Sequence, residues 1–412
     1  MKFLYSRCLF WFSISFLFSC SLFSQDIRYA NIPIYENKDL VPYKIQNKDY
    51  KKFKKLVKKY FFSMPESSYK GKNFSIYLLS KREMKILEKS NLSYESFSKS
   101  APFKYYDIGF DERYKKKFKK LNDLRAGYKD ERLNKIYLQA IAEKFPDKVK
   151  YFELGESRLG RVIPALEITS NKPSEYKIPI LFTGAHHANE LISTEHCYDI
   201  IYNLLNDFEK YEPYLEHISI WIVPIVNPDG SYFFWNQSVD MGRKNGYLPH
   251  DMQENDPTRG VDLNRNYPFR WNSGNRKASS GFSNNVFYRG ESPASEPETK
   301  SMISLAKRER FLFAMSFHSY ATAILFPYTI DNLTNPDPDY VKDLASRLVK
   351  YAKSVRANKE FAIRKNLYPV DGTDQDYYYH TFGTNAFIAE SSHQNVDYKI
   401  VKEILKGFKG VW

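Results

Sequence analysis

Two apolar runs near the middle of the chain indicate its fold: Lys177-Ile-Pro-Ile-Leu-Phe-Thr183 and Ile218-Ser-Ile-Trp-Ile-Val-Pro-Ile-Val226. Runs of this length with few polar residues are typical of strands that are buried on both faces. Between them, from Glu190 to about Tyr211, apolar residues recur at helical spacing. A strand, a helix and a second buried strand form a crossover unit, in which the two strands run parallel.

The alternation of helices and strands continues on both sides of this unit. Upstream, Leu133–Phe145 is expected to be an amphipathic helix that ends before Pro146. Downstream we expect a helix capped by Ser295, a strand over Phe311–Phe317, a helix from about Asp339 to Ala357, a strand over Phe387–Ala389 and a helix near Lys399–Phe408. The long polar segment Trp271–Ala294 is expected to be a loop, ordered or mobile, at the rim of a binding cleft. Residues 121–412 therefore predict an α/β domain with a mixed, mostly parallel central sheet and helices on both faces.

Chemically active side chains stand at the ends of these predicted strands. His187 and Glu190 follow the first strand, and His318 follows the run Phe311–Phe317 directly. Ligands of an open parallel sheet bind beyond the carboxyl ends of its strands. A catalytic zinc takes three nitrogen or oxygen ligands from the protein and keeps a fourth position for water. Each histidine alone would be read as a loop or core residue, but together with further segments they predict a site for one Zn²⁺ ion.

Five segments, in this order, resemble the zinc metallocarboxypeptidases of the carboxypeptidase A type, in particular bacterial secreted members: Gly184-Ala-His-His187-Ala-Asn-Glu190, Asn227-Pro-Asp-Gly230, Asp262-Leu-Asn-Arg265, His318-Ser-Tyr320 and Ala389-Glu390. The resemblance covers roughly Tyr128 to the C-terminus. It implies that zinc is held by His187, Glu190 and His318, which match the zinc-binding positions of the family.

The resemblance also implies roles for the other site residues. They are Asn264 and Arg265 for binding the terminal carboxylate, Arg243 for polarising the scissile carbonyl, Glu390 as catalytic base, Tyr368 as the mobile tyrosine over the substrate, and Gln375, with Asp374 beside it, as the floor of the side-chain pocket. A neutral Gln375 would favour neither charge, while an inward Asp374 would favour basic side chains, so a broad or basic-leaning preference is expected. One position departs from the family: Asn189 stands where many members carry an arginine that faces the substrate.

These residues predict a zinc-dependent metallocarboxypeptidase that hydrolyses the C-terminal peptide bond of peptides or proteins. Only a terminal carboxylate can reach Arg265 while the preceding carbonyl lies at the metal, so cleavage is restricted to the last residue. Two other functions remain open at this stage. One is hydrolysis of a cell-wall peptide, at the γ-D-glutamyl-diaminopimelate bond, and the other is a catalytically dead, peptide-binding protein with the same fold.

The first 24 residues read as a secretory signal. Met1-Lys2 and Arg7 supply a basic region, and a short apolar run follows. Leu17-Phe-Ser-Cys20 resembles a relaxed bacterial lipobox, so Cys20 is either a lipidated first residue, the one expected means of membrane attachment, or is discarded with the signal. We expect export to the periplasm, the cell envelope or the medium. Only Cys197 then belongs to the globular part, which excludes internal disulfides and favours a buried thiol.

The basic charge of the chain is concentrated in its N-terminal third. Residues 1–127 contain 27 Lys and Arg against 12 Asp and Glu, and the remaining residues contain 35 against 36. The lysine runs alternate with apolar residues at helical spacing, which indicates solvated helix faces and argues against a nucleic-acid partner. We predict a small α+β module over residues 26–120, either a propeptide or an accessory domain, ahead of a monomeric catalytic domain. The run Lys115–Lys120 would be its linker.

Overall fold

The computed structural model describes residues 29–31, 40–60, 67–70, 74–96, 102–104, 118–172, 174, 176–236, 242–246, 259–353, 360–391 and 395–408. The predicted signal segment with Cys20, and Lys115 to Lys117 of the predicted linker, lie outside these residues. Within the described part of the chain, no helix has both the length and the apolar character that crossing a membrane requires.

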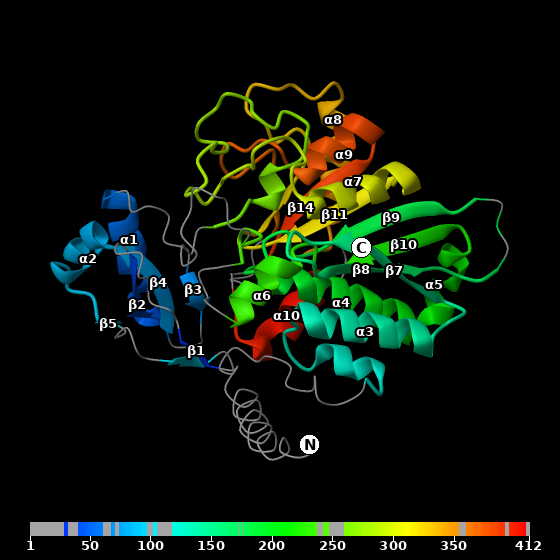
Figure 1. Ribbon diagram of the computed structural model, residues 1–412, viewed down its shortest axis with the longest axis horizontal. Coiled ribbons are helices and arrows are strands. Elements are labelled where there is room, and N and C mark those ends of the chain that lie inside the picture. Colours follow the sequence, from blue (N-terminus) through cyan, green and yellow to red (C-terminus); the bar gives the residue numbers. More distant parts are fainter. Residues whose placement is uncertain are drawn as a thin grey trace, which may run out of the picture.

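The large unit is built on an eight-stranded sheet with the order β13-β12-β14-β11-β9-β10-β8-β7 (Figure 1). Its strands are β7 (Val149–Glu156), β8 (Val162–Ile168), β9 (Ile178–Thr183), β10 (Ile218–Val223), β11 (Phe313–His318), β12 (Ala323–Leu325), β13 (Ala362–Arg364) and β14 (Asn385–Glu390). The pairs β10–β9, β9–β11, β11–β14 and β12–β13 are parallel, and the other three pairs are antiparallel. The predicted mixed, mostly parallel sheet is confirmed.

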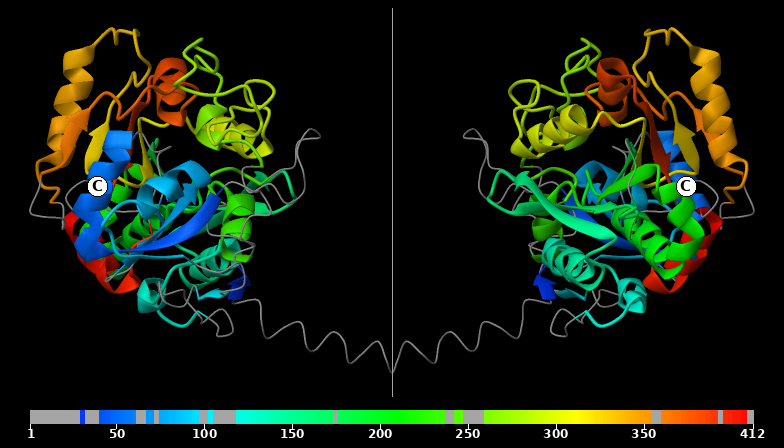
Figure 2. Two further views of the ribbon diagram at one scale, coloured as in Figure 1. Left: turned by 90° about the vertical axis from the view of Figure 1, so that its left-hand side faces the viewer. Right: turned by 90° about the vertical axis from the view of Figure 1, so that its right-hand side faces the viewer.

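Helices cover both faces of this sheet, as the sequence predicts. On one face lie α3 (Glu131–Lys144), α4 (Leu191–Asn206), α5 (Phe208–Leu215), α8 (Pro338–Val349) and α10 (Val401–Phe408), whose apolar residues belong to one core cluster. On the other lie α7 (Pro297–Glu309) and α9 (Asp374–Phe382), with a second cluster. A further helix, α6 (Pro228–Asn236), follows the end of β10. Figure 2 shows the layers from the two sides.

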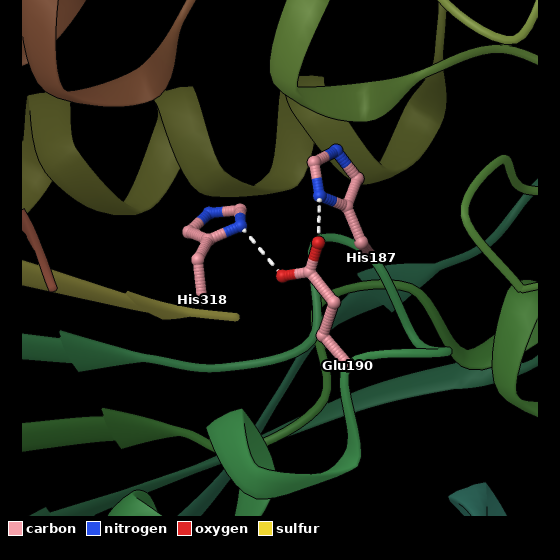
Figure 3. A group of neighbouring side chains, drawn as sticks. All are labelled: His187, Glu190 and His318. Atoms are coloured by element: carbon pink, nitrogen blue, oxygen red, sulfur yellow. Dashed lines mark hydrogen bonds and ion pairs between the residues drawn. The ribbon is translucent and has the colours of Figure 1, made fainter. Parts of the chain in front are cut away.

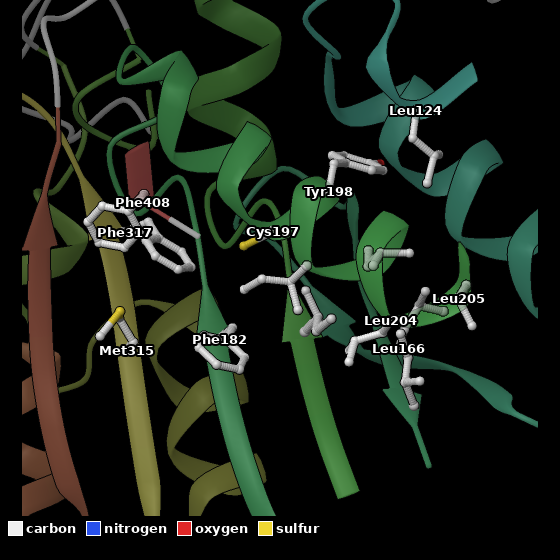
Figure 4. Packing of buried hydrophobic residues seen from close by; sticks show 14 of the residues in the cluster. Leu124, Leu166, Phe182, Cys197, Tyr198, Leu204, Leu205, Met315, Phe317 and Phe408 are labelled. Atoms are coloured by element: carbon white, nitrogen blue, oxygen red, sulfur yellow. The ribbon is translucent and has the colours of Figure 1, made fainter. Parts of the chain in front are cut away.

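The packing under α4 explains the single cysteine of the large unit. Cys197 lies on the buried side of α4, among side chains such as Phe182 of β9 and Phe317 of β11 (Figure 4). It is a free, fully buried thiol, and burial raises its pKa well above the usual value. A thiol that stays protonated in an apolar core is a packing residue and not a nucleophile.

Three helix boundaries differ from the sequence expectation. The expected helix from Glu190 to Tyr211 is interrupted at Asp207, whose φ and ψ of −117° and 39° are not helical, so α5 starts as a separate helix. Asn and Asp residues favour such a break because their side chains can compete with the helix backbone for hydrogen bonds. Here Asn206 Nδ2 donates to Asp207 Oδ1 at 2.8 Å. The helix expected to reach Ala357 ends at Val349, and its continuation to Ala352 is a turn.

The third boundary is the start of α7. Ser295 is not the cap residue, because Glu296 occupies that position and Pro297 opens the helix. A proline suits the first helical position, where no backbone donor is needed. The hydroxyl of Ser295 instead donates to the Glu296 carboxylate at 2.8 Å.

The N-terminal residues form a smaller unit with its own core. An antiparallel sheet has the order β3-β4-β2-β5 and is accompanied by two helices. The elements are β2 (Leu40–Gln46), α1 (Tyr50–Tyr60), β3 (Ser67–Lys70), β4 (Phe74–Ser80), α2 (Lys81–Glu88) and β5 (Tyr94–Ser96). Phe53 of α1 and Leu87 of α2 pack with Tyr43 and Tyr77 of the sheet. Two short strands, β1 (Tyr29–Asn31) and β6 (Pro102–Lys104), pair outside this sheet. The boundaries at residues 26 and 120 remain a prediction.

Candidate metal centre and cleft

The site lies where the central parallel strands end. In the β11–β14 pair, His318 is in register with Glu390, so the last residues of two neighbouring strands stand side by side. The loop after β9 brings His187 and Glu190 to the same edge. Its sharp path depends on Gly184, where a Cβ would lie 2.7 Å from the carbonyl oxygens of both Pro224 and Ser193. The topology therefore gathers residues that are far apart in the sequence.

Three buried side chains converge as the sequence predicts. Glu190 Oε1 lies 2.9 Å from His187 Nδ1, and Glu190 Oε2 lies 3.0 Å from His318 Nδ1 (Figure 3). The candidate ligand atoms of the three residues all lie within 4.8 Å of one another, and no other such group is found in the described residues. Two imidazole nitrogens and one carboxylate oxygen at this spacing fit the donor set of a catalytic zinc.

Electrostatics support the same interpretation of the three side chains. Burial alone would raise the pKa of the Glu190 carboxyl, but the adjacent His187 and His318 lower it well below its usual range. Burial lowers the pKa of His318, and the Glu190 carboxylate outweighs that effect and raises it. A buried carboxylate that stays ionised between two imidazoles is ready to bind a cation.

Both histidines are oriented by a second partner. His187 Nε2 lies 2.9 Å from Asp262 Oδ1, and His318 Nε2 lies 3.3 Å from Asn264 Nδ2. Metal-binding histidines usually donate their other N–H to a carboxylate or carbonyl, as His187 can to Asp262, whereas the Asn264 NH₂ group is a donor and can only bond to His318 Nε2 as an acceptor. The sequence interpretation did not give Asp262 a role. The sequence feature that could have indicated such a role is its position two residues before Asn264, in the segment that carries the carboxylate-binding pair.

Asp262 also holds Arg243. The guanidinium donates to Asp262 Oδ2 from Nε at 3.1 Å and from the terminal nitrogen at 2.8 Å. Burial would raise the pKa of the Asp262 carboxyl, but Arg243 and His187 keep it well below its usual range. One carboxylate thus orients a zinc-site histidine and the arginine expected at the scissile carbonyl.

Arg265 is almost completely buried at the base of the cleft. Its guanidinium donates to the Asn264 carbonyl at 2.7 Å and to the Ala278 carbonyl at 3.1 Å, and one terminal nitrogen lies 3.4 Å from the Tyr368 hydroxyl. Asn264 is held in turn, because its side-chain oxygen accepts a hydrogen bond from the backbone N–H of Asp374. A planar cation fixed in this way suits bidentate binding of a carboxylate.

Glu390 is the remaining acidic group at the edge of the sheet. Burial raises its pKa to about 7, helped by the negative charge of Glu190 and opposed by His318 and other cations. A carboxyl with a pKa near neutrality can both accept and release a proton at physiological pH.

Most predicted site residues line one pocket with an open space of about 380 Å³. Its walls include His187, His318, Asn264, Arg265, Tyr368 and Glu390, together with Leu325, Thr329, Asn366, Leu367, Val370, Thr373 and Ile388. Arg243 is not among the residues that line this pocket, and its connection to the site is its pair of hydrogen bonds to Asp262. Gln375 and Asp374 are buried in the first turn of α9, and the residue of that segment that reaches the pocket surface is Thr373. The pocket-floor role of Gln375 and Asp374 stays a prediction.

Phe287 is a neighbour of the site that sequence reasoning missed. It lies in the segment predicted as the cleft rim, and its ring centroid is 5.0 Å from the Arg243 guanidinium and 5.6 Å from that of Arg265. It also packs 6.1 Å from the Tyr368 ring. No pattern around Phe287 marks it, because its role depends on how the loop folds back over the arginines.

Comparison with known proteins identifies the family and the fold. A family model described as zinc carboxypeptidase matches residues 135–403. Metallocarboxypeptidase A of Trichophyton tonsurans is 32% identical over 255 residues, which cover 58% of this chain and 58% of the relative. The chain thus matches little more than half the length of that relative.

Two solved structures are similar in fold. Carboxypeptidase A from Helicoverpa armigera gives a TM-score of 0.68 at 20% identity and covers 92% of this chain and 96% of its own. Thrombin-activatable fibrinolysis inhibitor gives a TM-score of 0.69 at 18% identity, covering 90% and 97%. Both similarities cover more of the chain than the family model does.

Proposed function

This chain belongs to the zinc carboxypeptidase family, and we propose that it is a zinc-dependent metallocarboxypeptidase that removes the C-terminal residue of peptides or proteins. The observation that carries this proposal is one pocket that combines His187 and His318 of the three-residue metal centre with the Arg265 guanidinium and the Glu390 carboxyl. A metal centre, a carboxylate receptor and a proton acceptor are the parts that cleavage next to a free carboxylate requires.

The metal supplies the Lewis acid. Zinc held by His187, Glu190 and His318 would polarise the scissile carbonyl and lower the pKa of a bound water to about 7. The other site residues act on the substrate and on protons. Arg265, with Asn264, binds the terminal carboxylate and so fixes which carbonyl lies at the metal centre. Glu390 takes a proton from the attacking water and delivers it to the leaving amine.

Arg243 is the proposed oxyanion partner. Its bond to Asp262 fixes the direction of the guanidinium before substrate arrives, so little reorganisation is needed as negative charge develops on the carbonyl oxygen. Loss of one such donor typically costs about 10²–10³ in rate. Tyr368 lines the same pocket, with its hydroxyl 3.4 Å from an Arg265 nitrogen, and is the proposed tyrosine over the substrate.

We propose a broad or basic-leaning preference for the released residue. The pocket mixes apolar walls, such as Leu325 and Ile388, with the polar side chains of Thr329, Asn366 and Thr373. A strict aromatic preference would need an apolar end to this pocket, whereas the pocket residue Thr373 is followed by the buried polar residues Asp374 and Gln375. Matched N-acylated dipeptides ending in Phe, Leu, Lys and Glu would measure this. A Phe substrate that exceeds Lys by a hundredfold in kcat/KM would contradict it.

The function itself is tested by mass spectrometry of products. The purified, zinc-loaded chain is expected to remove single C-terminal residues from peptides with a free carboxylate and to leave C-terminal amides intact. A cell-wall stem peptide ending in γ-D-glutamyl-diaminopimelate serves as the competing substrate. Cleavage of the stem peptide alone would replace the proposed substrate class, and a folded chain without stoichiometric zinc or activity would overturn the enzyme assignment.

We further propose that the protein is exported and acts as a monomer. Support for export comes from the basic and apolar residues of the first 24 positions. Mass spectrometry of the mature N-terminus from expressing cells distinguishes cleavage after the apolar run from lipidation of Cys20. An intact Met1 would contradict export through this signal.

A further inference from the structure

Two separate loops carry the arginines of the proposed reaction, and each loop has a buried asparagine next to its arginine. Asn245 lies two residues after Arg243, and Asn266 directly follows Arg265. Neither asparagine side chain reaches solvent or lines the pocket. Their side chains instead contact the residues at the start of helix α7.

Glu296, the residue before α7, contacts both asparagines. Its carboxylate oxygen Oε2 accepts a hydrogen bond from Asn245 Nδ2 at 2.7 Å. Its backbone N–H donates to Asn266 Oδ1 at 3.1 Å. The same residue therefore bonds the arginine loop of Arg243 through its side chain and the arginine loop of Arg265 through its backbone. Glu296 is 1% exposed, so it cannot itself touch a substrate in the cleft.

The carboxylate of Glu296 is an acceptor for four donors, which its negative charge explains. Besides Asn245, Arg158 donates to Oε1 at 3.0 Å and to Oε2 at 3.3 Å, and the Ser295 hydroxyl donates to Oε1 at 2.8 Å. Ser295 Oγ in turn accepts from Asn266 Nδ2 at 2.9 Å. An amide in the same place would point an N–H₂ group at groups that are themselves donors.

The two loops have little freedom to adjust by themselves. The Asn245 backbone N–H donates to the Val261 carbonyl at 3.1 Å, and the Val261 backbone N–H donates to the side-chain oxygen Oδ1 of Asn245 at 2.9 Å. At Gly290 a Cβ would lie 2.5 Å from Ser295 Oγ and 2.7 Å from Asn266 Nδ2. A displacement at Glu296 is therefore passed to both loops, because the surrounding backbone is packed without space.

We infer that Glu296 is a positioning residue that sets the placement of Arg243 relative to Arg265. The inference rests on the proposed function, in which Arg265 receives the terminal carboxylate and Arg243 the scissile carbonyl. The distance between the two guanidinium groups therefore determines that the carbonyl next to the terminal carboxylate is the one that is cleaved. Glu296 acts through Asn245 and Asn266 and takes no part in the chemistry.

Glu296→Gln tests this inference, with Glu298→Gln as the matched control. Glu298 lies in the first turn of the same helix and is equally buried, and burial raises its pKa to about 8, so its substitution removes little charge at neutral pH. It accepts from the Arg158 backbone at 3.1 Å, and its contact with Asn245 is the longer one, at 3.5 Å. The readout is kcat/KM on a peptide with a free C-terminal carboxylate and on the same peptide as its C-terminal amide.

Wild type is expected to prefer the carboxylate strongly. Glu296→Gln should lower kcat/KM for the carboxylate peptide by about 10- to 100-fold, since a misplacement of about 1 Å can cost about 10²-fold, and should shrink the carboxylate-to-amide ratio. Glu298→Gln should keep the wild-type ratio. Equal losses on both peptides, or a Glu296→Gln ratio like that of wild type, would overturn the inference. If the wild-type protein had the same kcat/KM for the carboxylate peptide and for its amide, the proposed function would be refuted instead.

Two loop variants decide the question if Glu296→Gln does not fold. Asn266→Ala should mainly raise KM for the carboxylate peptide, because Asn266 adjoins the arginine that binds the ground-state substrate. Asn245→Ala should mainly lower kcat, because Asn245 adjoins the arginine whose contact strengthens in the transition state. The same change in kcat and KM in both variants would show a general structural defect and overturn the inference.

Discussion

The pKa values of two carboxyls beside His318, the buried Glu190 and the partly exposed Glu390, are shifted in opposite directions. Glu190 is bonded to two imidazoles, and these lower its pKa well below the usual range although burial opposes them. For Glu390, desolvation by the surrounding protein and the charge of Glu190 raise the pKa to about 7. Two carboxylates whose environments separate their pKa values in this way are suited to different tasks, one as a permanent anion for a metal and one as a proton carrier.

The first prediction separates these two tasks. Glu390→Gln should retain zinc and the wild-type melting temperature while kcat falls by about 10²–10⁴, since only the proton transfer is removed. His318→Ala should lose zinc, because two ligands hold the ion poorly. For both variants, zinc content is measured by atomic emission and kcat is measured on one peptide substrate. Near-wild-type turnover of Glu390→Gln would refute its assignment as the base.

At the scale of elements, the start of α9 is fastened to the turn that carries Arg265. Gly372 lies just before α9 with φ of +62°, and its carbonyl accepts from the Tyr267 N–H at 3.0 Å. A Cβ there would lie 2.4 Å from the carbonyl oxygen of Arg265. The glycine thus permits both the left-handed backbone and the close approach of two chain segments.

The second prediction uses two glycines that differ in one respect. Gly372→Ala should destabilise the protein by about 1–3 kcal/mol and also raise KM, since the backbone of Arg265 must move. Gly383→Ala is the control: Gly383 ends α9 with φ of +69°, but no atom lies within 4 Å of its would-be Cβ. It should lose stability and keep KM. A raised KM in both variants would show that strain alone, and not the contact with Arg265, changes binding.

The third prediction concerns helix α4 and the residue after β14. His196 on α4 is fully buried and lies 2.7 Å from the Ser391 hydroxyl, and burial lowers its pKa to about 3. An unfolded histidine has a pKa of about 6.5, so between pH 6.5 and pH 3 the unfolded state binds a proton that the folded state does not. The stability that this histidine contributes is present above pH 6.5 and is lost as the pH falls, by up to about 1.4 kcal/mol per pH unit.

Melting temperatures of wild type and His196→Gln between pH 7 and pH 4 measure this effect. The variant lacks the titrating ring, so its melting temperature should fall less steeply with acid than that of wild type. Parallel curves would show that His196 does not contribute to acid sensitivity, and a steeper curve for the variant would reverse the sign of the assignment.

At the scale of the whole molecule, the basic charge and the chemistry are separated. The lysines of α1 belong to the small N-terminal unit, whereas the metal centre belongs to the large unit (Figure 1). The fold likeness to carboxypeptidase A from Helicoverpa armigera covers 92% of the chain, so it extends into this N-terminal unit, which the family model does not include. We hypothesise that the unit covers or chaperones the catalytic cleft.

The fourth prediction follows from this hypothesis. A site for a sequence-specific protease placed in the Lys115–Lys120 run, followed by cleavage, should raise activity on a small peptide severalfold while the zinc content stays constant. The matched control carries a scrambled site and receives the same protease. Unchanged activity after complete cleavage would favour a permanent accessory domain and contradict the covering role.

The order of helices and strands could be read from local patterns, and the candidate metal ligands from their places at predicted strand ends together with the family resemblance of their segments. Hydrophobic runs such as Ile218–Val226 predict buried strands because burial on both faces imposes apolar side chains at consecutive positions. His187 and Glu190 are three residues apart, so their convergence is a local matter. His318 could be added because strand ends of a parallel sheet share one edge.

Other parts of the site depended on contacts that no local pattern encodes. Asp262 joins His187 to Arg243, Phe287 covers two arginines, and Glu296, which the sequence placed in a helix capped by Ser295, bonds the loops of Asn245 and Asn266. The expectation that Ser295 caps this helix was wrong, because Glu296 occupies the cap position and the Ser295 hydroxyl bonds to the Glu296 carboxylate and to Asn266. Periodicity reports which face of an element is buried, whereas a hydrogen bond between distant loops depends on where the whole chain places them. The sequence alone therefore determined the architecture and the residue types available for the metal centre, and only the tertiary structure decided how those residues are oriented and held.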